Sequence, residues 1–439
     1  MKKRILAIVL CIVMVLPFVA CNMNRNLPEE PQMQEDEIHT ETQICWPEVP
    51  LDSEKAIIAV SDFAVRLLQA EDVVAGGIER NGRNRLISPI SVLNAIAMTA
   101  NGAENETREQ MEKTFGISIE YLNEYLSSYQ KSFPQEDGNR FHMANSIWFT
   151  EDNRFTVEEE FLNINQTYYG ADIFEKSFDQ TTISEINQWV EDNTDGLIKE
   201  IINEIPKDAV MYLINALVFD GKWEEAYEES DIREGIFTTF DGIEQEIDLM
   251  FSSENMYLED EKATGFIKYY EGRDYAFVAL LPKEEIALTD YINTLTGEKL
   301  KKILSNPMEV KTHVWLPKFE VEYQSELKNT LIGMGIKDVF DGDKADLSGI
   351  GTSTNGNLFV DRVIHKTYIE VSPVGTRAGA ATAVEIKDEC AVIEPEEFKE
   401  VRLDRPFFYM IIDCDMNLPI FMGTLNYAQP YRCGVIDTN

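Results

Sequence analysis

Residues 375–382 read Gly-Thr-Arg-Ala-Gly-Ala-Ala-Thr, and this run of small side chains constrains the fold more than any other stretch of the chain. It lacks the bulk to anchor a core, yet it alternates as a strand does. From Thr376 to Ile386 every even-numbered residue is small or apolar, while charged residues such as Arg377 fall on odd positions. The alternation fails at Asp388. The segment therefore predicts a loop that can become a strand with one buried face, ending near Ile386.

Composition limits the partners that this chain can have. The 439 residues are 44% hydrophobic, which is enough to bury a large core, and 78 acidic against 39 basic residues give a formal net charge of -39. So acidic a surface repels the phosphates of nucleic acids and of anionic membranes. We therefore expect no nucleic-acid partner and no polyanionic cofactor.

The N-terminus predicts export. A basic start precedes an apolar run over residues 5–15, which is too short to span a membrane, and Ala20 stands directly before Cys21. This arrangement resembles a bacterial lipoprotein cleavage site, so we expect residues 1–20 to be a lipoprotein-type signal peptide and Cys21 to carry the lipid. Phe18 replaces the usual Leu, and ordinary signal cleavage is the alternative. The mature protein would be extracellular or displayed on a bacterial cell surface, and would reach the membrane through the lipid anchor at Cys21.

Residues 21–50 hold four prolines among many acidic residues and predict a flexible acidic tether. Four further cysteines allow three disulfide pairings, and the sequence does not choose between these and free thiols, which are the simplest expectation. They are Cys45, Cys390, Cys414 and Cys433.

Residues 51–439 predict a single domain of mixed α and β structure, because no second polar linker and no internal repeat interrupts them. The first half is rich in helices: an amphipathic face over residues 57–68 follows the capping candidates Asp52 and Ser53, and another helix is expected over 183–190. The later part is rich in strands, expected at 275–281, 310–316, 358–363, 366–371, 407–412 and 420–427. The fold class is therefore α+β with large, mostly antiparallel sheets.

Few residues offer catalytic chemistry. The four histidines have no second histidine at metal-ligand spacing, and no nucleophile, phosphate-binding or dinucleotide motif occurs. We expect no metal, no other cofactor and no enzyme activity. His365 stands between two apolar strands and is expected to be a hydrogen-bonded core histidine.

The small-residue segment resembles the hinge of the serpin reactive loop, and the resemblance extends from about Leu51 to Gln429. Six stretches carry it. They are Leu-Ile-Ser-Pro-Ile-Ser at 86–91, Ile-Asn-Gln-Trp-Val at 186–190, Asn-Ala-Leu-Val-Phe-Asp-Gly-Lys-Trp at 215–223, Leu-Pro-Lys-Phe at 316–319, Ile-His-Lys at 364–366, and Arg-Pro-Phe-Phe at 405–408 with Phe-Met-Gly at 421–423. Their common order along the chain makes chance similarity negligible.

The resemblance implies the serpin fold of three β-sheets with eight or nine helices and an exposed reactive centre loop, here at about residues 373–404. It also implies a suicide-substrate inhibitor of serine endopeptidases, with cysteine endopeptidases as further targets. A target protease forms an acyl-enzyme with the loop, and the cut loop then inserts as a new strand of the main sheet, which distorts the protease. Such a protein is an inhibitor without catalytic groups of its own, and we expect a monomer.

The resemblance also assigns roles to individual residues. The hinge comprises Gly375, Thr376, Arg377, Ala378, Gly379, Ala380, Ala381 and Thr382. Its glycine permits the bend where insertion begins, and its small side chains offer little resistance to entry between two strands. The polar cluster beneath the opening sheet would be Ser88, Ser91, Asn215 and His365. Trp223 would pack where insertion begins, near Lys318, and ordinary core packing is the alternative role for these residues.

Three residues depart from the pattern of inhibitory serpins. Pro373 and Val374 occupy positions that usually hold an acidic pair, the first of which pairs with the lysine that Lys318 matches. We expect Pro373 to remove a backbone donor where the strand should pair. Arg377 replaces a usual Glu at an outward position. A non-inhibitory binding serpin, or a substrate with leaky trapping, is therefore the alternative function.

The usual spacing from Gly375 places the bond that is cut between Glu389 and Cys390. An acidic residue there selects glutamate-specific, granzyme-like or caspase-like proteases, because their primary pockets are basic. A shorter register would place the cut between Lys387 and Asp388, and a trypsin-like target would follow. A surface hydrolase is the remaining alternative and lacks a nucleophile constellation.

Overall fold

A six-stranded sheet, here called the main sheet, runs through the part of the chain that the structure describes. This structure is a computed structural model, and it describes residues 53–74, 83–132, 140–376 and 398–429, all within the unit Val49–Asn439. The order of strands in the main sheet is β11 (Phe319–Glu326), β13 (Ile364–Ser372), β14 (Gly375–Thr376), β5 (Met211–Lys222), β2 (Arg140–Thr150) and β4 (Asp172–Lys176).

A nine-stranded sheet and a two-stranded sheet hold the other strands of the described residues. The larger sheet runs in the order β1 (Arg85–Ile87), β17 (Leu418–Leu425), β16 (Phe407–Asp413), β9 (Tyr275–Pro282), β8 (Ala263–Tyr269), β7 (Glu244–Glu259), β10 (Met308–Pro317) and β15 (Lys399–Arg402), with β6 (Ile232–Thr238) also beside β7. The smaller one pairs β12 (Gly351–Ser353) with β3 (Phe155–Val157). Strands β9, β16 and β17 are buried along their whole length, so both of their faces are covered.

Nine α-helices form within the described ranges. They are α1 (Ser53–Val74), α3 (Pro89–Ala100), α4 (Asn105–Phe115), α5 (Ile119–Lys131), α6 (Glu159–Tyr169), α7 (Gln180–Asn193), α8 (Leu288–Ile292), α9 (Gly297–Leu304) and α10 (Lys328–Met334). Together with the three sheets they confirm the predicted α+β class and the expected serpin architecture. The signal peptide and tether predicted over residues 1–50 lie outside the described residues.

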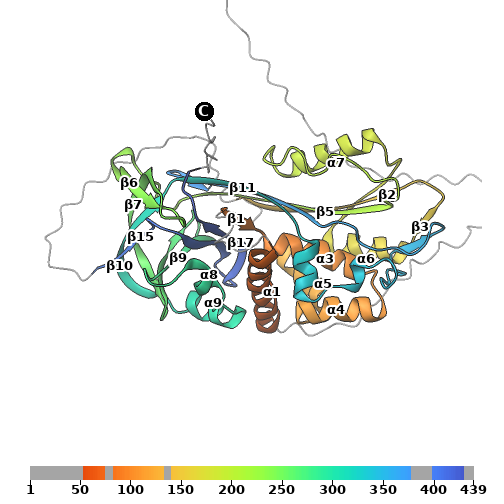
Figure 1. The fold of residues 1–439 in the computed structure, drawn as a ribbon, viewed down its shortest axis with the longest axis horizontal. Coiled ribbons are helices and arrows are strands. Elements are labelled where there is room, and N and C mark those ends of the chain that lie inside the picture. The colour runs from red at the N-terminus through yellow and green to blue at the C-terminus, as the bar shows by residue number, and fades with distance from the viewer. Residues whose placement is uncertain (1–52, 75–82, 133–139, 377–397, 430–439) are drawn as a thin grey trace, which may run out of the picture. The chain divides into compact units, whose positions relative to one another are not determined.

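Helices cover both faces of the main sheet (Figure 1). α7 lies over β2 and β5 on one face, and α3 packs against β5 on the other. Helix α3 is buried at 11 of its 12 positions, begins with Pro89 in its first turn, and is capped by the Ser88 hydroxyl, which accepts from the Ser91 N–H. Helix α7 buries only one stripe, which includes Ile183, Ile186 and Val190.

A buried carboxylate anchors the outer strand of the main sheet to α1. Glu71 is 2% exposed and accepts hydrogen bonds from Tyr323 Oη at 2.5 Å, from Ser325 Oγ, and from Thr330 Oγ1 at 2.5 Å. Tyr323 and Ser325 belong to β11, and Thr330 to α10. These bonds fix β11, and through its ladder β13, to the helical layer.

One predicted strand is wrong. Residues 358–363 contain four β-branched, aromatic or aliphatic residues, as a strand often does, but they pair with no strand in the described structure. Their backbone instead bonds to a short 3-10 helix and to a side chain: Val360 N–H donates to Val339 O in the turn Asp338–Phe340, and Val363 N–H donates to Glu326 Oε1 at the end of β11. A segment with strand propensity forms a strand only where a neighbouring strand can pair with it. Here residues 358–363 line a cavity instead. The helices expected at 57–68 and 183–190 and the other five expected strands form.

Candidate functional site

Two hinge residues already lie in the main sheet. Gly375 and Thr376 form β14, which pairs antiparallel with β13 on one side and with β5 on the other. Thr376 lies opposite Val371 and Gly221. The first two residues of the hinge therefore already lie in the gap between β13 and β5.

Pro373 and Val374 form the turn that leads from β13 into β14. Their carbonyl groups accept hydrogen bonds from the segment that follows β5. Trp223 N–H donates to Val374 O at 3.1 Å, and Tyr227 N–H donates to Pro373 O at 2.9 Å. The expectation that Pro373 removes a donor from a pairing strand is wrong, because the position is a turn. The fixed φ of proline favours the first corner of a turn and costs no ladder bond there.

Gly375 is required by close approach. A Cβ atom at this position would lie 2.1 Å from the Gly221 carbonyl oxygen and 2.9 Å from Lys222 Cα, both backbone atoms that cannot move aside cheaply. Only glycine lets β14 lie this close to β5.

Thr376 is buried, on the face that the alternation assigns to it, with 1% of its surface exposed. Its hydroxyl is 2.5 Å from Tyr270 Oη. The Tyr270 ring stacks on Trp223, with the ring centroids 4.6 Å apart, and meets Phe219 edge-on. Burial raises the pKa of Tyr270 well above its usual range, so the phenol stays neutral and available for this bond.

Trp223 lies beside the turn between β13 and β14. Its indole Nε1–H donates to Ser372 O at 2.8 Å. Beneath the indole lies Lys268, 2% exposed, whose ammonium group is 2.8 Å from Glu254 Oε1 and 4.5 Å from the centre of the Tyr227 ring. Lys318, in contrast, is exposed where β10 meets β11. The sequence reasoning missed Tyr270, Tyr227 and Lys268, which lie far from the hinge along the chain and carry no motif.

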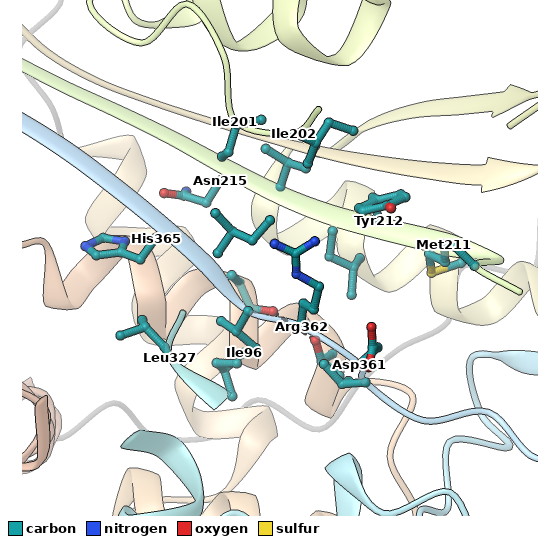
Figure 2. Close-up of a pocket in the computed structure, with 18 of the residues that line it drawn as sticks. Ile96, Ile201, Ile202, Met211, Tyr212, Asn215, Leu327, Asp361, Arg362 and His365 are labelled. Carbon is teal, nitrogen blue, oxygen red and sulfur yellow. Dashed lines mark hydrogen bonds between the residues drawn. The ribbon is translucent and has the colours of Figure 1, made fainter. Parts of the chain in front are cut away.

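Beyond β14, a cavity of about 460 Å³ lies between β5 and β13. In the described structure β13 pairs with β11 and β14, and β5 with β2 and β14, so below β14 the two strands are not bonded to one another. Ile96 of α3 lines the cavity on one side and Ile201 and Ile202, after α7, line it on the other (Figure 2). This cavity and the β14 position above it are here called the slot.

The slot contains all four residues of the predicted polar cluster. Ser88 N–H donates to His365 Nε2 at 3.1 Å, and Ser88 Oγ donates to Ile420 O at 3.0 Å while it accepts from the Ser91 N–H at 3.4 Å. Burial lowers the pKa of His365 to about 4, against the upward effect of the Glu71 charge. His365 is therefore neutral at pH 7, as its role as an acceptor requires.

Asn215 lies across the slot from these residues (Figure 2). Its Nδ2 donates to Asn145 Oδ1 at 2.8 Å, while its own buried Oδ1 has no hydrogen-bond partner in the structure. The structure thus bonds Ser88, Ser91 and His365 together and places Asn215 on the facing strand. The other predicted site residues, Arg377 to Thr382, Lys387 to Cys390 and Cys21, lie outside the described residues.

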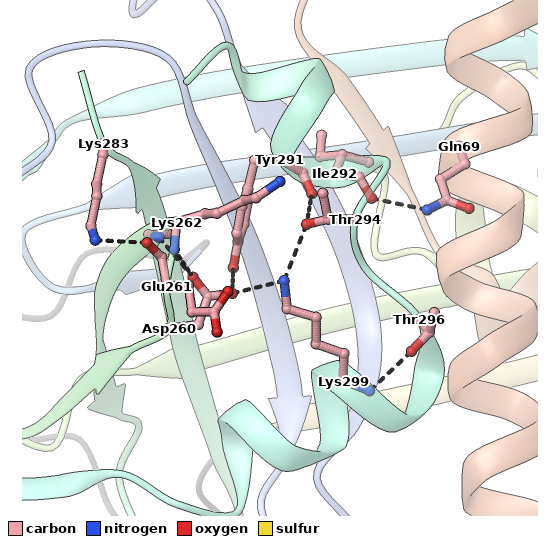
Figure 3. Close-up of polar contacts among 11 residues, drawn as sticks. Gln69, Asp260, Glu261, Lys262, Lys283, Tyr291, Ile292, Thr294, Thr296 and Lys299 are labelled. Atoms are coloured by element: carbon pink, nitrogen blue, oxygen red, sulfur yellow. Dashed lines mark hydrogen bonds and ion pairs between the residues drawn. The ribbon is translucent and has the colours of Figure 1, made fainter. Parts of the chain in front are cut away.

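A cluster of ionisable groups outside the slot is structural. It centres on Asp260, whose Oδ1 accepts from the N–H groups of Lys262 and Ala263 at 2.7 Å and whose Oδ2 is 3.0 Å from Lys299 Nζ (Figure 3). Burial acts in the opposite direction, but these donors hold the pKa of Asp260 below its usual value. The network ties the β7–β8 turn to α9 and offers no free nucleophile.

Metal and thiol chemistry also find little support in the described ranges. There, no group of three or more His, Cys, Asp or Glu side chains is placed to hold a metal ion. Cys414 is a free, half-buried thiol, and burial together with nearby carboxylates raises its pKa to about 12. The other cysteines lie outside the described residues. No helix within the described ranges has the length and apolar character needed to cross a membrane.

Sequence comparison places these features in a family. The family model of serpins, described as serine protease inhibitors, matches residues 59–428. This chain belongs to the serpin family. Serpins are protease inhibitors and not enzymes.

Individual serpins are similar over most of their length. Human neuroserpin is 29% identical over 79% of this chain and 86% of its own, and mouse leukocyte elastase inhibitor A is 30% identical over 77% and 92%. The solved structure of tengpin, a thermophilic serpin in the native state, superposes with a TM-score of 0.79 at 46% identity and covers 87% of this chain and 96% of tengpin.

Proposed function

We propose that this serpin is a suicide-substrate inhibitor that traps a target endopeptidase as the acyl-enzyme by inserting its cleaved loop into the slot. The observation that carries the proposal is β14: Gly375 and Thr376 already pair with both walls of the slot. Further residues that enter would gain ladder hydrogen bonds alternately to β5 and to β13.

The register of β14 supports insertion of the whole hinge. Six further steps along both ladders, from 376 to 382, 221 to 215 and 371 to 365, bring Thr382 between Asn215 and His365. The Thr382 hydroxyl would then face the unpartnered Oδ1 of Asn215. A buried acceptor without a partner is costly, so this bond would stabilise the inserted state.

The same register accounts for the small residues and for the end of the strand. Ala378 would lie between Phe219 and Ile369, where a larger side chain would meet a filled core. Ile386 would lie opposite Met211, the first residue of β5. On this wall of the slot, β5 therefore ends where the alternation in the sequence ends.

For the target, we propose a protease that cuts after Glu389, with a glutamate-specific, granzyme-like or caspase-like pocket. Cleavage after Lys387 by a trypsin-like protease is the alternative. For the location, we propose export and display on a bacterial cell surface through a lipid at Cys21. Palmitate labelling of wild type and Cys21→Ala tests the anchor, and equal labelling of the two would contradict it.

Incubation with a panel of proteases tests the inhibitory function. We expect a complex with one protease that resists SDS, and mass spectrometry of the released C-terminal fragment identifies the bond that was cut. Cleavage within residues 387–391 that leaves the protease fully active would instead support a non-inhibitory binding serpin or a leaky substrate.

Thr376→Arg tests the slot directly. Thr376 is buried against Tyr270, so a long charged side chain there should block entry and convert the inhibitor into a substrate. Thr376→Ser keeps the hydroxyl and the small size and is the matched control. Undiminished complex formation by Thr376→Arg would contradict insertion.

A further inference from the structure

A row of aromatic side chains lies on the partly exposed face of the nine-stranded sheet, outside the slot. Phe251 of β7 lies opposite Trp315 of β10, with the ring centroids 4.8 Å apart, and the His313 ring is centred 5.5 Å from the Phe251 ring. Phe398, just before β15, stacks on His313 with the centroids 4.4 Å apart. The first three rings are half-buried and Phe398 is 52% exposed, so these four residues, here called the aromatic row, are accessible to a partner.

Two arginines stack on the indole of this row. The guanidinium carbon of Arg402 on β15 lies 4.8 Å from the centre of the Trp315 ring, and that of Arg233 on β6 lies 5.8 Å from it. Arg233 is exposed and forms no ion pair with another described residue, while Arg402 has one long ion pair, at 3.7 Å, with Asp404. A guanidinium group that stacks on an indole keeps the N–H donors at its edge free, and their geometry matches a carboxylate. The Trp315 end of the row therefore presents two ordered cations with donors to spare.

The row lies at the C-terminal end of the predicted reactive loop. Phe398 comes eight residues after Cys390, the residue that follows the proposed cleavage point. Eight extended residues span at most about 28 Å, which is about the diameter of a small domain. A protease that holds this bond in its active site is therefore kept within reach of the aromatic row.

We propose that Trp315, Arg233 and Arg402 form a second contact surface for the target protease, which binds a carboxylate-bearing surface segment beside the protease active site. The inference rests on the proposed function, since it concerns the same partner. Tryptophan and arginine are the side chains that most often carry the binding energy of protein interfaces. Glu400, opposite His313, makes the other end of the row less suited to a carboxylate. The contact acts at short range, so it slows dissociation of the protease and leaves long-range steering to the net charge.

Binding of an inactive protease tests this surface separately from trapping. The probe is a glutamate-specific endopeptidase whose catalytic serine is replaced by alanine, which can hold the loop but cannot form an acyl-enzyme. We expect Arg233→Ala and Arg402→Ala each to raise the Kd for this probe about fivefold, mainly through faster dissociation, and Arg233→Glu to raise it about twentyfold, because repulsion replaces attraction. With the active protease, the stoichiometry of inhibition, which is the moles of serpin consumed for each mole of protease trapped, should stay as in wild type, because neither arginine lines the slot.

Lys302→Ala, which removes one positive charge at an exposed site on α9, is the matched control and should bind the probe as wild type does. Thermal midpoints within about 2 °C of wild type would show that the variants fold. Unchanged Kd values for the three arginine variants would overturn the second contact surface alone, whereas a wild-type serpin that does not bind the probe would overturn it together with the proposed target class. If the arginine variants weaken binding but the active protease cuts the loop and escapes, the surface is supported and the proposed trapping is overturned.

Discussion

At the scale of single residues, the position of β14 depends on Gly375, which has no side chain. Because a Cβ on residue 375 would lie 2.1 Å from the Gly221 carbonyl oxygen, we expect Gly375→Ala to push β14 away from β5. Overpacking of this kind costs about 1–3 kcal/mol, and the first unfolding transition in urea should move to lower concentration. Gly333→Ala is the control, because an added Cβ there meets nothing within 4 Å. Equal midpoints for the two variants would contradict the close approach.

His365 gives the slot a pH dependence whose sign is fixed. The pKa of His365 in the folded state, about 4, lies below the usual histidine value of 6.5, so the unfolded chain binds the proton more tightly. Stability conferred by neutral His365 is complete above about pH 6.5 and is lost as the pH falls toward 4, by up to about 3 kcal/mol.

Urea unfolding midpoints between pH 7.5 and 4.5 measure this loss. His365→Gln keeps an acceptor for the Ser88 N–H and cannot titrate, so its midpoint should fall less steeply over the same range. His313→Gln on β10 serves as the control and should follow wild type. Identical slopes for wild type and His365→Gln would show that His365 does not carry the effect.

At the scale of elements, the segment after α7 that contains Ile201 and Ile202 covers the slot, and the side chain of Asn187 holds it in place. Asn187 accepts from the N–H groups of Ile201 and Ile202 at 2.9 and 3.1 Å and donates to Ile202 O at 2.7 Å. Both isoleucines line the cavity. An inserting strand must pass beneath them, so this segment opposes entry.

We therefore expect Asn187→Ala to destabilise the uncleaved protein by about 1–3 kcal/mol and to lower the stoichiometry of inhibition, because insertion becomes faster. Gln188→Ala, which removes an exposed contact with Asp192 on the same helix, is the control and should change neither quantity. An Asn187→Ala variant with lower stability and a higher stoichiometry of inhibition would show that the segment assists entry.

The elements also show what the sequence could predict and why. Alternation identified the buried face of the hinge, and Thr376 lies on it, because period-2 patterning records which side of a strand meets the core. Propensity failed over residues 358–363 and at Pro373, because it does not report which neighbour a segment will find. The Glu71 anchor and the Tyr270 bond join residues more than 100 positions apart, which no local pattern encodes.

At the scale of the molecule, the main sheet of the described structure combines two anchored strands with a gap between two strands that are not paired. β11 and β13 are tied to α1 and α10 through Glu71, whereas below β14 no ladder bond joins β13 to β5. A sheet with unbonded neighbours leaves backbone groups whose pairing would release free energy. Insertion of residues 377–383 would fill the gap between β5 and β13 as far as the start of β13 at Ile364, which is the physical reason to expect the cleaved form to be the more stable one.

The net charge of -39 acts at a different step, the encounter with the protease. Electrostatic steering extends over about 10 Å at 0.1 M salt, so association with a basic protease should slow as salt is added, by at least about threefold between 0.05 and 0.5 M. For a less basic protease that cuts the same bond, the association rate constant should fall less as salt is added, or even rise. A sulfated glycan should accelerate association with neither protease, since both the glycan and the serpin are acidic. Second-order rate constants at several salt concentrations measure this. Acceleration by the glycan, or a rate for the basic protease that does not depend on salt, would mean that a local basic patch and not the acidic surface as a whole governs the encounter.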